Sequence, residues 1–306
     1  MKKKSFGVMI LAMSLVILGC PDPAGDIGGA ATKDYFSSTI GILKYVPGGT
    51  FQRDATPTNI SVITEPFRMS QCEITRLQFY TIMGTDPSNP VCSSGESDPV
   101  QVVNWYHAIA FCNKLSIAEG FTPAYSVTVG GTPIDFGTLA YASIPTGSNA
   151  EWNAASANWS VDGYRLPTEM EWMWAAMGAD TANPGQVNYG GYAKLFAGYT
   201  GSNLIDDYAW YFNNSSDRTH PVGTTLPNEL GLYDMSGNVL EWCWDWYNLL
   251  YPTGAATDYR GAASGTIRIM RGGCRSMDMP FCTVAKRWSA EPEGVASITG
   301  FRVVRP

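Results

Sequence analysis

The chain has 306 residues, a formal net charge of −7 and a sequence pI of about 4.9. This acidic balance argues against a nucleic-acid partner, because backbone phosphates attract basic surfaces. Charged residues make up only 15% of the chain, while 32 glycines and 19 prolines predict a loop-rich fold with short strands and few helices.

The first 40 residues predict an export signal followed by a membrane tether. A lysine-rich start precedes an apolar run over residues 6–18, and Cys20 follows shortly after it. This order is typical of a bacterial lipoprotein signal, and the run is shorter than the roughly 20 residues that span a membrane. We expect 1–19 to be removed, Cys20 to carry lipid, and 20–40 to serve as anchor and flexible tether at the outer membrane surface of the cell envelope.

Residues 41–306 predict a single α+β domain of low regular content, with short strands and two main helices. The pattern over 41–51, interrupted by Pro-Gly-Gly, predicts a strand, a turn and a second strand, and 67–74 alternates like a further strand. A short helix is expected over about 75–83. Residues 121–161 are rich in Gly, Thr, Ser and Pro, which predicts hairpins and an insertion.

The two main helices carry clear boundary signals. Asn104 fits the N-cap of a helix whose apolar residues recur at helical spacing, and Gly120 follows its end. The other helix opens with a capping box formed by Thr168 and Glu171, and Gly178 ends it.

Six cysteines remain besides Cys20. Oxidation in an exported protein would allow fifteen pairings, and spacing does not choose among them; buried free thiols are the equal alternative. Because no CxxC pair occurs, a thiolate zinc site is not supported. The six are Cys72, Cys92, Cys112, Cys243, Cys274 and Cys282.

The segment 274–298 shows no readable periodicity and mixes charged, aromatic and small residues. It lies between an Arg-Gly-Gly motif at 271–273 and a Gly-Phe-Arg motif at 300–302. A core segment would show a strand or helix period, and a solvated linker would lack Phe and Trp. An irregular, chemically mixed segment held between fixed ends is typical of a binding surface.

Several further motifs occur in a fixed order along the chain. They stand at 99–106, 111–116, 164–172, 220–223, 231–246, 271–273 and 300–302. Together they resemble the sulfatase-modifying-factor family, the formylglycine-generating-enzyme-like proteins. The resemblance covers roughly 41–306 and implies an elaborated C-type-lectin fold.

More narrowly, the chain resembles the variable proteins of diversity-generating retroelements, in particular the variable lipoproteins of treponemes. Those with this fold carry a mutable segment between Arg-Gly-Gly and a terminal Gly-Phe-Arg. The resemblance implies a replaceable ligand-binding site, here within about 274–298. Its expected members are Arg275, Ser276, Met277, Asp278, Pro280, Phe281, Lys286, Trp288, Ser289, Ala290, Glu291, Glu293, Gly294, Ala296 and Ser297.

Framework residues are expected to hold this set in place. Residues 283–285 are apolar enough to predict a buried strand, and Arg271, Arg287 and Phe301 are expected to be fixed. The ligand is unknown and is expected to be a protein or another surface molecule of a host or microbe. The chain is expected to be a monomer that meets the membrane only through its lipid.

An oxygen-dependent modifying enzyme of the formylglycine-generating type is the alternative. Such enzymes use two nearby cysteines after Arg-Gly-Gly to bind copper. Here Cys282 matches the later position, Met277 occupies the earlier one, and Cys274 comes too early. A thioether suits Cu(I) but cannot act as a redox-active thiolate, so neither a catalytic residue nor copper is expected.

Iron and calcium are the other metals that proteins of this kind could hold. Non-haem iron needs several histidines, whereas the chain has two: His107, expected on a solvated helix face, and His220, expected to pack. The family resemblance also implies a structural calcium site. Its expected ligands are the side chains of Asp234 and Glu241 and the main-chain carbonyls of Gly237 and Val239. The alternative is that the two carboxylates accept backbone hydrogen bonds without a metal.

Overall fold

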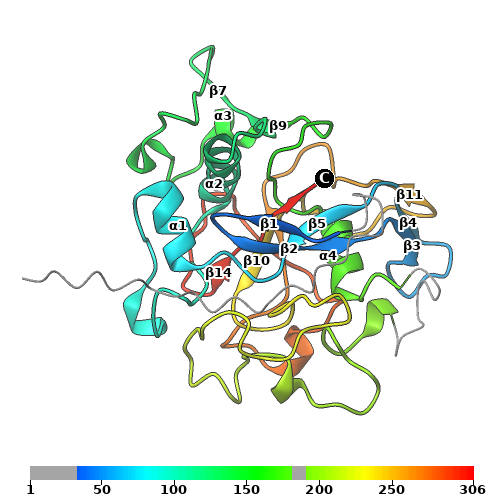
Figure 1. Ribbon diagram of the computed structural model, residues 1–306. Helices are drawn as coiled ribbons and strands as arrows, with labels where there is room; N and C mark the ends of the chain where they lie inside the picture. Colours follow the sequence, from blue (N-terminus) through cyan, green and yellow to red (C-terminus); the bar gives the residue numbers. More distant parts are fainter. Residues whose placement is uncertain (1–32, 181–190) are drawn as a thin grey trace, which may run out of the picture. The chain divides into compact units, whose positions relative to one another are not determined.

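The computed structural model describes residues 33–180 and 191–306 (Figure 1). The expected signal peptide and Cys20 lie outside these residues. Lys33–Pro306 forms one compact unit, and its short strands and few helices give the α+β class predicted from the sequence. No helix among the described residues is long and apolar enough to cross a membrane.

The first sheet joins strands from both ends of the unit, in the order β1-β2-β5-β15. Its antiparallel strands are β1 Tyr35–Ser37, β2 Gly41–Val46, β5 Phe67–Ser70 and β15 Val304–Arg305. Figure 1 shows the red C-terminal strand beside blue strands from the beginning of the unit. Strand β1 falls inside the expected tether 20–40, which is therefore too long. The ring of Tyr35 packs 6.2 Å from Phe121 and 4.4 Å from the Arg305 guanidinium, so the fold begins here.

The two strands expected around Pro-Gly-Gly exist, but they do not pair with each other. Strand β3 Gly49–Gln52 pairs instead with β4 Ile60–Ile63, and β11 Ala256–Thr257 joins β4 in parallel. A side chain at Gly49 would lie 2.5 Å from the Trp174 ring. The missing side chain thus lets the chain pass against this tryptophan and enter a second sheet.

A third sheet includes residues 288–290 of the 274–298 segment. Its order is β13-β12-β10-β14, with β14 parallel to β10 and the other pairs antiparallel. The strands are β10 Leu240–Trp246, β12 Arg268–Arg271, β13 Trp288–Ala290 and β14 Thr299–Gly300. The Arg-Gly-Gly and Gly-Phe-Arg motifs therefore reach the same sheet, on opposite sides of β10.

The helices begin where the sequence predicts. Helices α1 Arg76–Met83, α2 Trp105–Ala118 and α4 Glu169–Ala176 each start with a capping box, at Thr75, Asn104 and Thr168. The short helix α3 Ala150–Asn153 lies in the predicted insertion. That insertion also holds two small ribbons, β6 Tyr125–Ser126 with β9 Ser156–Ala157, and β7 Thr128–Val129 with β8 Thr132–Pro133. Single 3₁₀ turns are η2 Pro90–Cys92, η3 Tyr141–Ser143, η4 Gly191–Ala193, η5 Ile205–Asp207 and η6 Met279–Phe281.

Two buried apolar clusters stabilise these elements. One surrounds α2, where Phe79 stacks on Phe111 at 5.6 Å. The other surrounds α4, where Trp174 stacks on Phe51 at 5.4 Å. Each large buried side chain contributes roughly 1.5–3 kcal/mol through its removal from water, so these clusters supply most of the driving force.

His107 is buried, contrary to the expectation of a solvated position. It is only 2% exposed and stacks on Tyr141 from the insertion, with ring centroids 4.7 Å apart. Its Nδ1 accepts a hydrogen bond from the Asn104 backbone N–H at 3.2 Å, which completes the capping box of α2. Burial lowers the pKa of His107 to about 4, so the ring is neutral near pH 7.

The buried histidine predicts an acid-sensitive helix. Between the folded-state pKa of about 4 and the unfolded value near 6.5, the unfolded chain binds more protons, so acid favours unfolding. We expect this residue to remove up to about 3 kcal/mol of unfolding free energy as the pH falls through that window.

His107→Gln, which keeps an acceptor at this position, is the comparison for urea unfolding from pH 7 to 4. The raised pKa of Asp234 acts in the opposite direction but is present in both proteins, so it cancels in their difference. A pH-independent difference between the two proteins would contradict the prediction.

Candidate functional site

The backbone of the 274–298 segment is held by a buried arginine outside the replaceable set. The Arg271 guanidinium is fully buried and donates to the carbonyl oxygens of Val284 at 2.8 Å, Ala285 at 3.1 Å and Lys286 at 2.6 Å. Every residue type carries a backbone carbonyl, so these bonds do not depend on the neighbouring side chains.

A second anchor ties the segment to α4. Arg287 donates from Nε and Nη2 to the two carboxylate oxygens of Glu169, at 2.7 and 2.8 Å. Glu169 is 1% exposed and is the first residue of α4. A bidentate pair of this kind fixes direction as well as distance, which sets where the following strand β13 begins.

The two ends of the segment are also held through their backbone. Near the start, Ser236 Oγ donates to the Cys282 carbonyl at 2.9 Å. Near the end, the Trp105 N–H at the start of α2 donates to the Pro292 carbonyl at 2.9 Å, and the Val102 N–H donates to the Ala296 carbonyl at 3.0 Å. The framework therefore holds the backbone of the segment at several positions from Cys282 to Ala296.

Most of the expected ligand-binding side chains reach solvent. Ser276, Asp278, Pro280, Phe281 and Glu291 are exposed. The half-buried members are Met277, Lys286, Trp288, Ser289, Ala290, Glu293, Gly294, Ala296 and Ser297. Met279 and Val295, which were not in the expected set, are 37% and 51% exposed. The sequence pattern does not separate these two residues from Met277 and Phe281, which were in the expected set.

Arg275 is the exception and does not belong to the exposed set. It is 2% exposed, and its Nη1 forms an ion pair with Asp217 and donates to the Asp217 carbonyl at 2.6 Å. Its Nη1 therefore finds its partners across 58 residues of sequence, whereas its buried Nε has no hydrogen-bond partner in the described residues. Arg275 is therefore a framework residue.

Residues 283–285 form a turn, not the buried strand that was predicted. Only Val284 is buried, while Thr283 and Ala285 are half-buried, and the Lys286 N–H donates to the Thr283 carbonyl at 3.1 Å. In an extended strand, successive carbonyls point in opposite directions. Three consecutive carbonyls that converge on Arg271 require the chain to turn, so the strand starts later, at Trp288.

Phe281 and Trp288 form an aromatic ledge on this surface. Their rings lie 5.8 Å apart, and Trp288 Nε1 donates to the Phe281 carbonyl at 3.3 Å. The Lys286 ammonium lies 5.1 Å from each ring. Phe281 is 40% exposed, whereas Trp288 is half-buried and packs against the apolar cluster around α2.

All six cysteines of the described residues are free. Cys274 and Cys282 are fully buried, which raises the pKa of both thiols, in Cys282 to about 12. Cys274 belongs to the apolar cluster around α2, and Cys282 belongs to a smaller cluster with Phe196 and Tyr211. The half-buried Met277 packs against both clusters. Thiolate is the reactive form of cysteine, and burial makes it scarce here near neutral pH.

The residues expected to bind calcium are engaged by the protein itself. Both carboxylate oxygens of Glu241 accept from Arg302, each at 2.7 Å, and Asp234 accepts from the Gly223 N–H at 2.8 Å. Burial raises the pKa of Asp234 to about 6. As arranged, the set does not fit a calcium ion, and calcium binding stays a prediction that requires Glu241 to leave Arg302.

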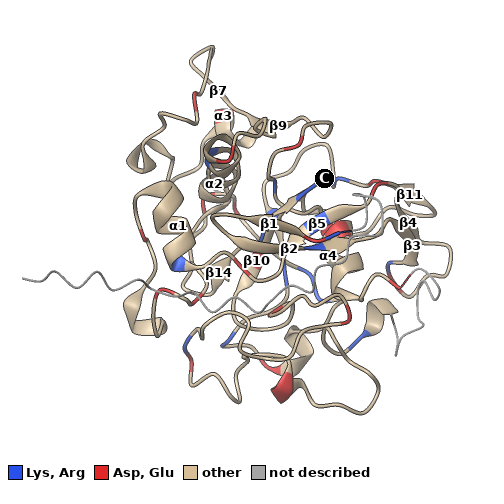
Figure 2. Ribbon diagram, in the orientation of Figure 1, with Lys and Arg blue, Asp and Glu red and all other residues tan. Residues whose placement is uncertain are grey.

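Neither histidine points to a metal site. His220 stacks on Trp210 at 3.8 Å, so it packs as the family resemblance implies. Across 33–180 and 191–306, no group of three or more His, Cys, Asp or Glu side chains is arranged to hold a metal ion. Figure 2 shows lysines and arginines scattered over this part of the chain.

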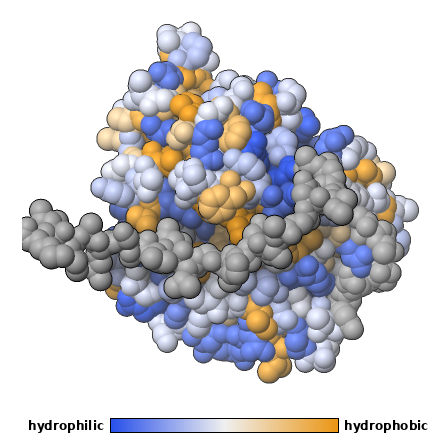
Figure 3. All heavy atoms as spheres, viewed as in Figure 1, coloured by the Kyte–Doolittle hydropathy of each residue, from blue (hydrophilic) through white to orange (hydrophobic). Residues whose placement is uncertain are grey.

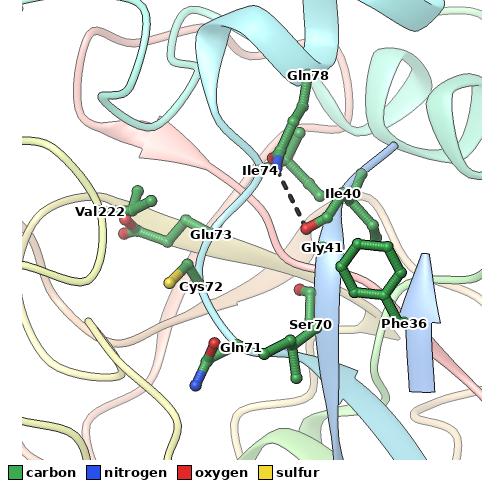
Figure 4. A pocket seen from close by; sticks show the side chains of 11 residues that line it. Phe36, Ile40, Gly41, Ser70, Gln71, Cys72, Glu73, Ile74, Gln78 and Val222 are labelled. Atoms are coloured by element: carbon green, nitrogen blue, oxygen red, sulfur yellow. Dashed lines mark hydrogen bonds between the residues drawn. The ribbon is translucent and has the colours of Figure 1, made fainter. Parts of the chain in front are cut away.

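A separate pocket of about 300 Å³ lies between β1, β2 and the chain that follows β5 (Figure 4). Phe36, Ile42 and Val222 give it apolar walls, and Cys72 and Glu73 stand beside them. Burial raises the pKa of the Cys72 thiol and of the Glu73 carboxyl, so neither is a ready nucleophile or base. On the face in Figure 3, hydrophobic residues occur in small groups among polar ones.

Replacing Arg271, whose guanidinium donates to three carbonyls, should loosen the 274–298 segment. In Arg271→Lys, an ammonium cannot reach three carbonyls in one plane, and buried acceptors are left unpaired. We expect a loss of about 2–4 kcal/mol in urea unfolding and faster hydrogen exchange of the amides that follow residue 283.

The matched control is Arg260→Lys. Arg260 is an exposed arginine stacked 4.3 Å from Trp159, and its replacement should change stability by no more than about 0.5 kcal/mol. Equal effects of the two substitutions would show that Arg271 does not organise the segment.

Nearly all of the described chain is similar to known proteins. Residues 38–306 match the family described as sulfatase-modifying factor enzyme 1-like domain. The chain is 31% identical over 281 residues to the chaperone protein LppX of Paenibacillus barcinonensis, covering 86% of this chain and 89% of that protein. It is 29% identical over 287 residues to the formylglycine-generating enzyme of Thermomonospora curvata, covering 84% and 91%.

Among solved structures, Treponema denticola variable protein 1 superposes with a TM-score of 0.78 at 35% identity. The match covers 90% of this chain and 99% of that one. The chain therefore belongs to the sulfatase-modifying-factor, or formylglycine-generating-enzyme-like, family and has its C-type-lectin fold.

Proposed function

We propose that this chain is a lipid-anchored protein of the cell envelope, displayed at the outer surface, that binds ligands through replaceable side chains of the 274–298 segment. The observation that carries the proposal is the Arg271 fork on three backbone carbonyls. These hydrogen bonds would hold the backbone path of the segment while its side chains change. The likeness to a variable protein and to LppX supports a scaffold that is not catalytic.

Physical chemistry explains why such a segment tolerates change. Substitutions at exposed positions away from caps and buried bonds usually alter stability by about 0.5 kcal/mol or less. Ser276, Asp278 and Glu291 are exposed, and the Ser276 hydroxyl makes one weak contact with the framework, 3.4 Å from Cys274 Sγ. Diversity written there would change the ligand without unfolding the scaffold.

The surface has the composition of a protein-binding patch. Phe281 and Trp288 offer aromatic area for binding hot spots, while Asp278, Lys286 and Glu291 offer directional polar contacts. A protein or another surface molecule of a host or microbe fits this mixture better than a small metabolite, which needs an enclosed pocket. The proposed binding unit is one monomer.

The competing proposal, an oxygen-using enzyme of the formylglycine-generating type, has less support in this chain. Met277 stands where those enzymes have their first cysteine, and a thioether carries no thiolate. Cys282, at the second position, keeps its proton because burial raises its pKa to about 12. We therefore propose a binding role without catalytic residues and without copper.

A pair of displayed libraries tests the replaceable surface. The first library randomises Ser276, Asp278, Phe281, Trp288 and Glu291. Most of its members should fold as judged by protease resistance, and panning against one immobilised test protein, hen lysozyme, should enrich binders.

The matched library randomises five buried framework residues and should be mostly protease-sensitive, with no enrichment. Equal loss of folded members in both libraries, or no binder from the first, would contradict the proposal. The framework positions are Arg271, Cys282, Val284, Phe301 and Arg302.

The proposed anchor predicts a change of compartment in Cys20→Ser. Without the thiol that accepts lipid, the chain should leave the membrane fraction, fail to partition into detergent and lose surface labelling. The matched control Cys92→Ser, a half-buried cysteine of the folded unit, should stay in the membrane. Membrane retention of Cys20→Ser would disprove the anchor.

A further inference from the structure

Strand β13 is the edge strand of its sheet and lies inside the variable segment. Trp288 stands opposite Met270, and Ala290 opposite Arg268, so one side of β13 is paired with β12. Outside that ladder, no backbone group of Trp288–Ala290 has a hydrogen-bond partner in the described part of the chain. An unpaired strand edge is a template for another extended chain.

A free positive charge lies beside this edge. The Lys286 ammonium lies 5.1 Å from the rings of both Phe281 and Trp288, and no carboxylate of the described residues is within ion-pair distance of it. A lysine without a carboxylate partner is notable in a chain whose net charge is −7. An ammonium on an aromatic ledge offers a charge-assisted bond to an anion next to apolar area.

We propose that the segment recognises an extended peptide with an acidic side chain next to an apolar one. The peptide adds a strand to the free edge of β13 and places its carboxylate on Lys286, with the apolar side chain against Phe281 and Trp288. This inference rests on the proposed ligand-binding role of 274–298. It names the ligand class as peptide because backbone pairing at a strand edge matches another backbone.

Edge pairing also agrees with a segment whose side chains change. The backbone N–H and C=O groups of 288–290 that point away from β12 are the same whatever residues stand there. They provide a constant part of the contact, while the side chains around them select among peptides. Alternate peptide side chains would point toward the ledge, because a strand has a period of two.

The test uses the purified full-length chain on an array of seven-residue peptides with Thr and Val at alternating positions. The central residue is Glu, Gln or Lys, and its neighbours on the same face are Leu or Trp. Glu peptides should bind about tenfold tighter than Gln peptides, and Lys peptides weakest.

Variants of the chain show whether Lys286 sets this preference. Lys286→Gln should abolish the preference for Glu, and Lys286→Glu should favour Lys peptides. The matched control Lys114→Gln, another half-buried lysine, should keep the original order. N-methylation of the central peptide amides should lower affinity about tenfold or more by removing donors, without any change to the protein.

The binding results separate failure of the peptide inference from failure of the proposed function. Equal binding of Glu and Lys peptides, or of methylated and unmethylated ones, would overturn the inference. Binding to a glycan array or to intact proteins, with no peptide bound, would also overturn it while leaving the proposed function intact. Failure to bind any peptide, glycan or intact protein would count against the proposed function itself.

Discussion

A single buried guanidinium holds the path of the 274–298 segment. Arg271 gathers three consecutive carbonyls, and its charge lies 3.8 Å from Glu169, which also pairs with Arg287. Taking charges out of water is costly unless they are paired and hydrogen-bonded, so removing one partner disturbs the others. Arg271 and Arg287 therefore share one carboxylate at the start of α4, and the segment keeps its shape through buried or half-buried groups of the framework.

Local signals were sufficient for the helices but not for the sheets. The caps at Asn104 and Thr168 depend on residues three positions apart, so the sequence displays them. Strands β2 and β3 pair with distant partners, and nothing in the Pro-Gly-Gly pattern reports that the chain changes sheet between them. His107 was misjudged for a similar reason, because the insertion that buries it follows α2 and contributes Tyr141 from 34 residues away.

The site could be located from sequence more reliably than its individual residues could be assigned. The two flanking motifs bound the segment, and the family resemblance gave it meaning. Arg275 looked available because its partner Asp217 lies 58 residues earlier in the chain. Residues 283–285 looked like a strand because apolar composition carries no information about three carbonyls drawn to one side. In both cases, long-range hydrogen bonds to arginine decided the structure, and single-sequence patterns do not record them.

The position of β15 at the very end of the chain bears on how errors in the gene would be tolerated. Val304 pairs with Met69 and bridges Arg165, and Arg302 neutralises Glu241 inside the core. All of these contacts are made by residues that follow the 274–298 segment in the chain. A frameshift or stop codon within 274–298 would leave β5 paired only with β2, and the buried Glu241 carboxylate without its arginine. If the segment is diversified as proposed, a chain with a lost reading frame could not complete the fold, whereas a chain with single-residue replacements at exposed positions could.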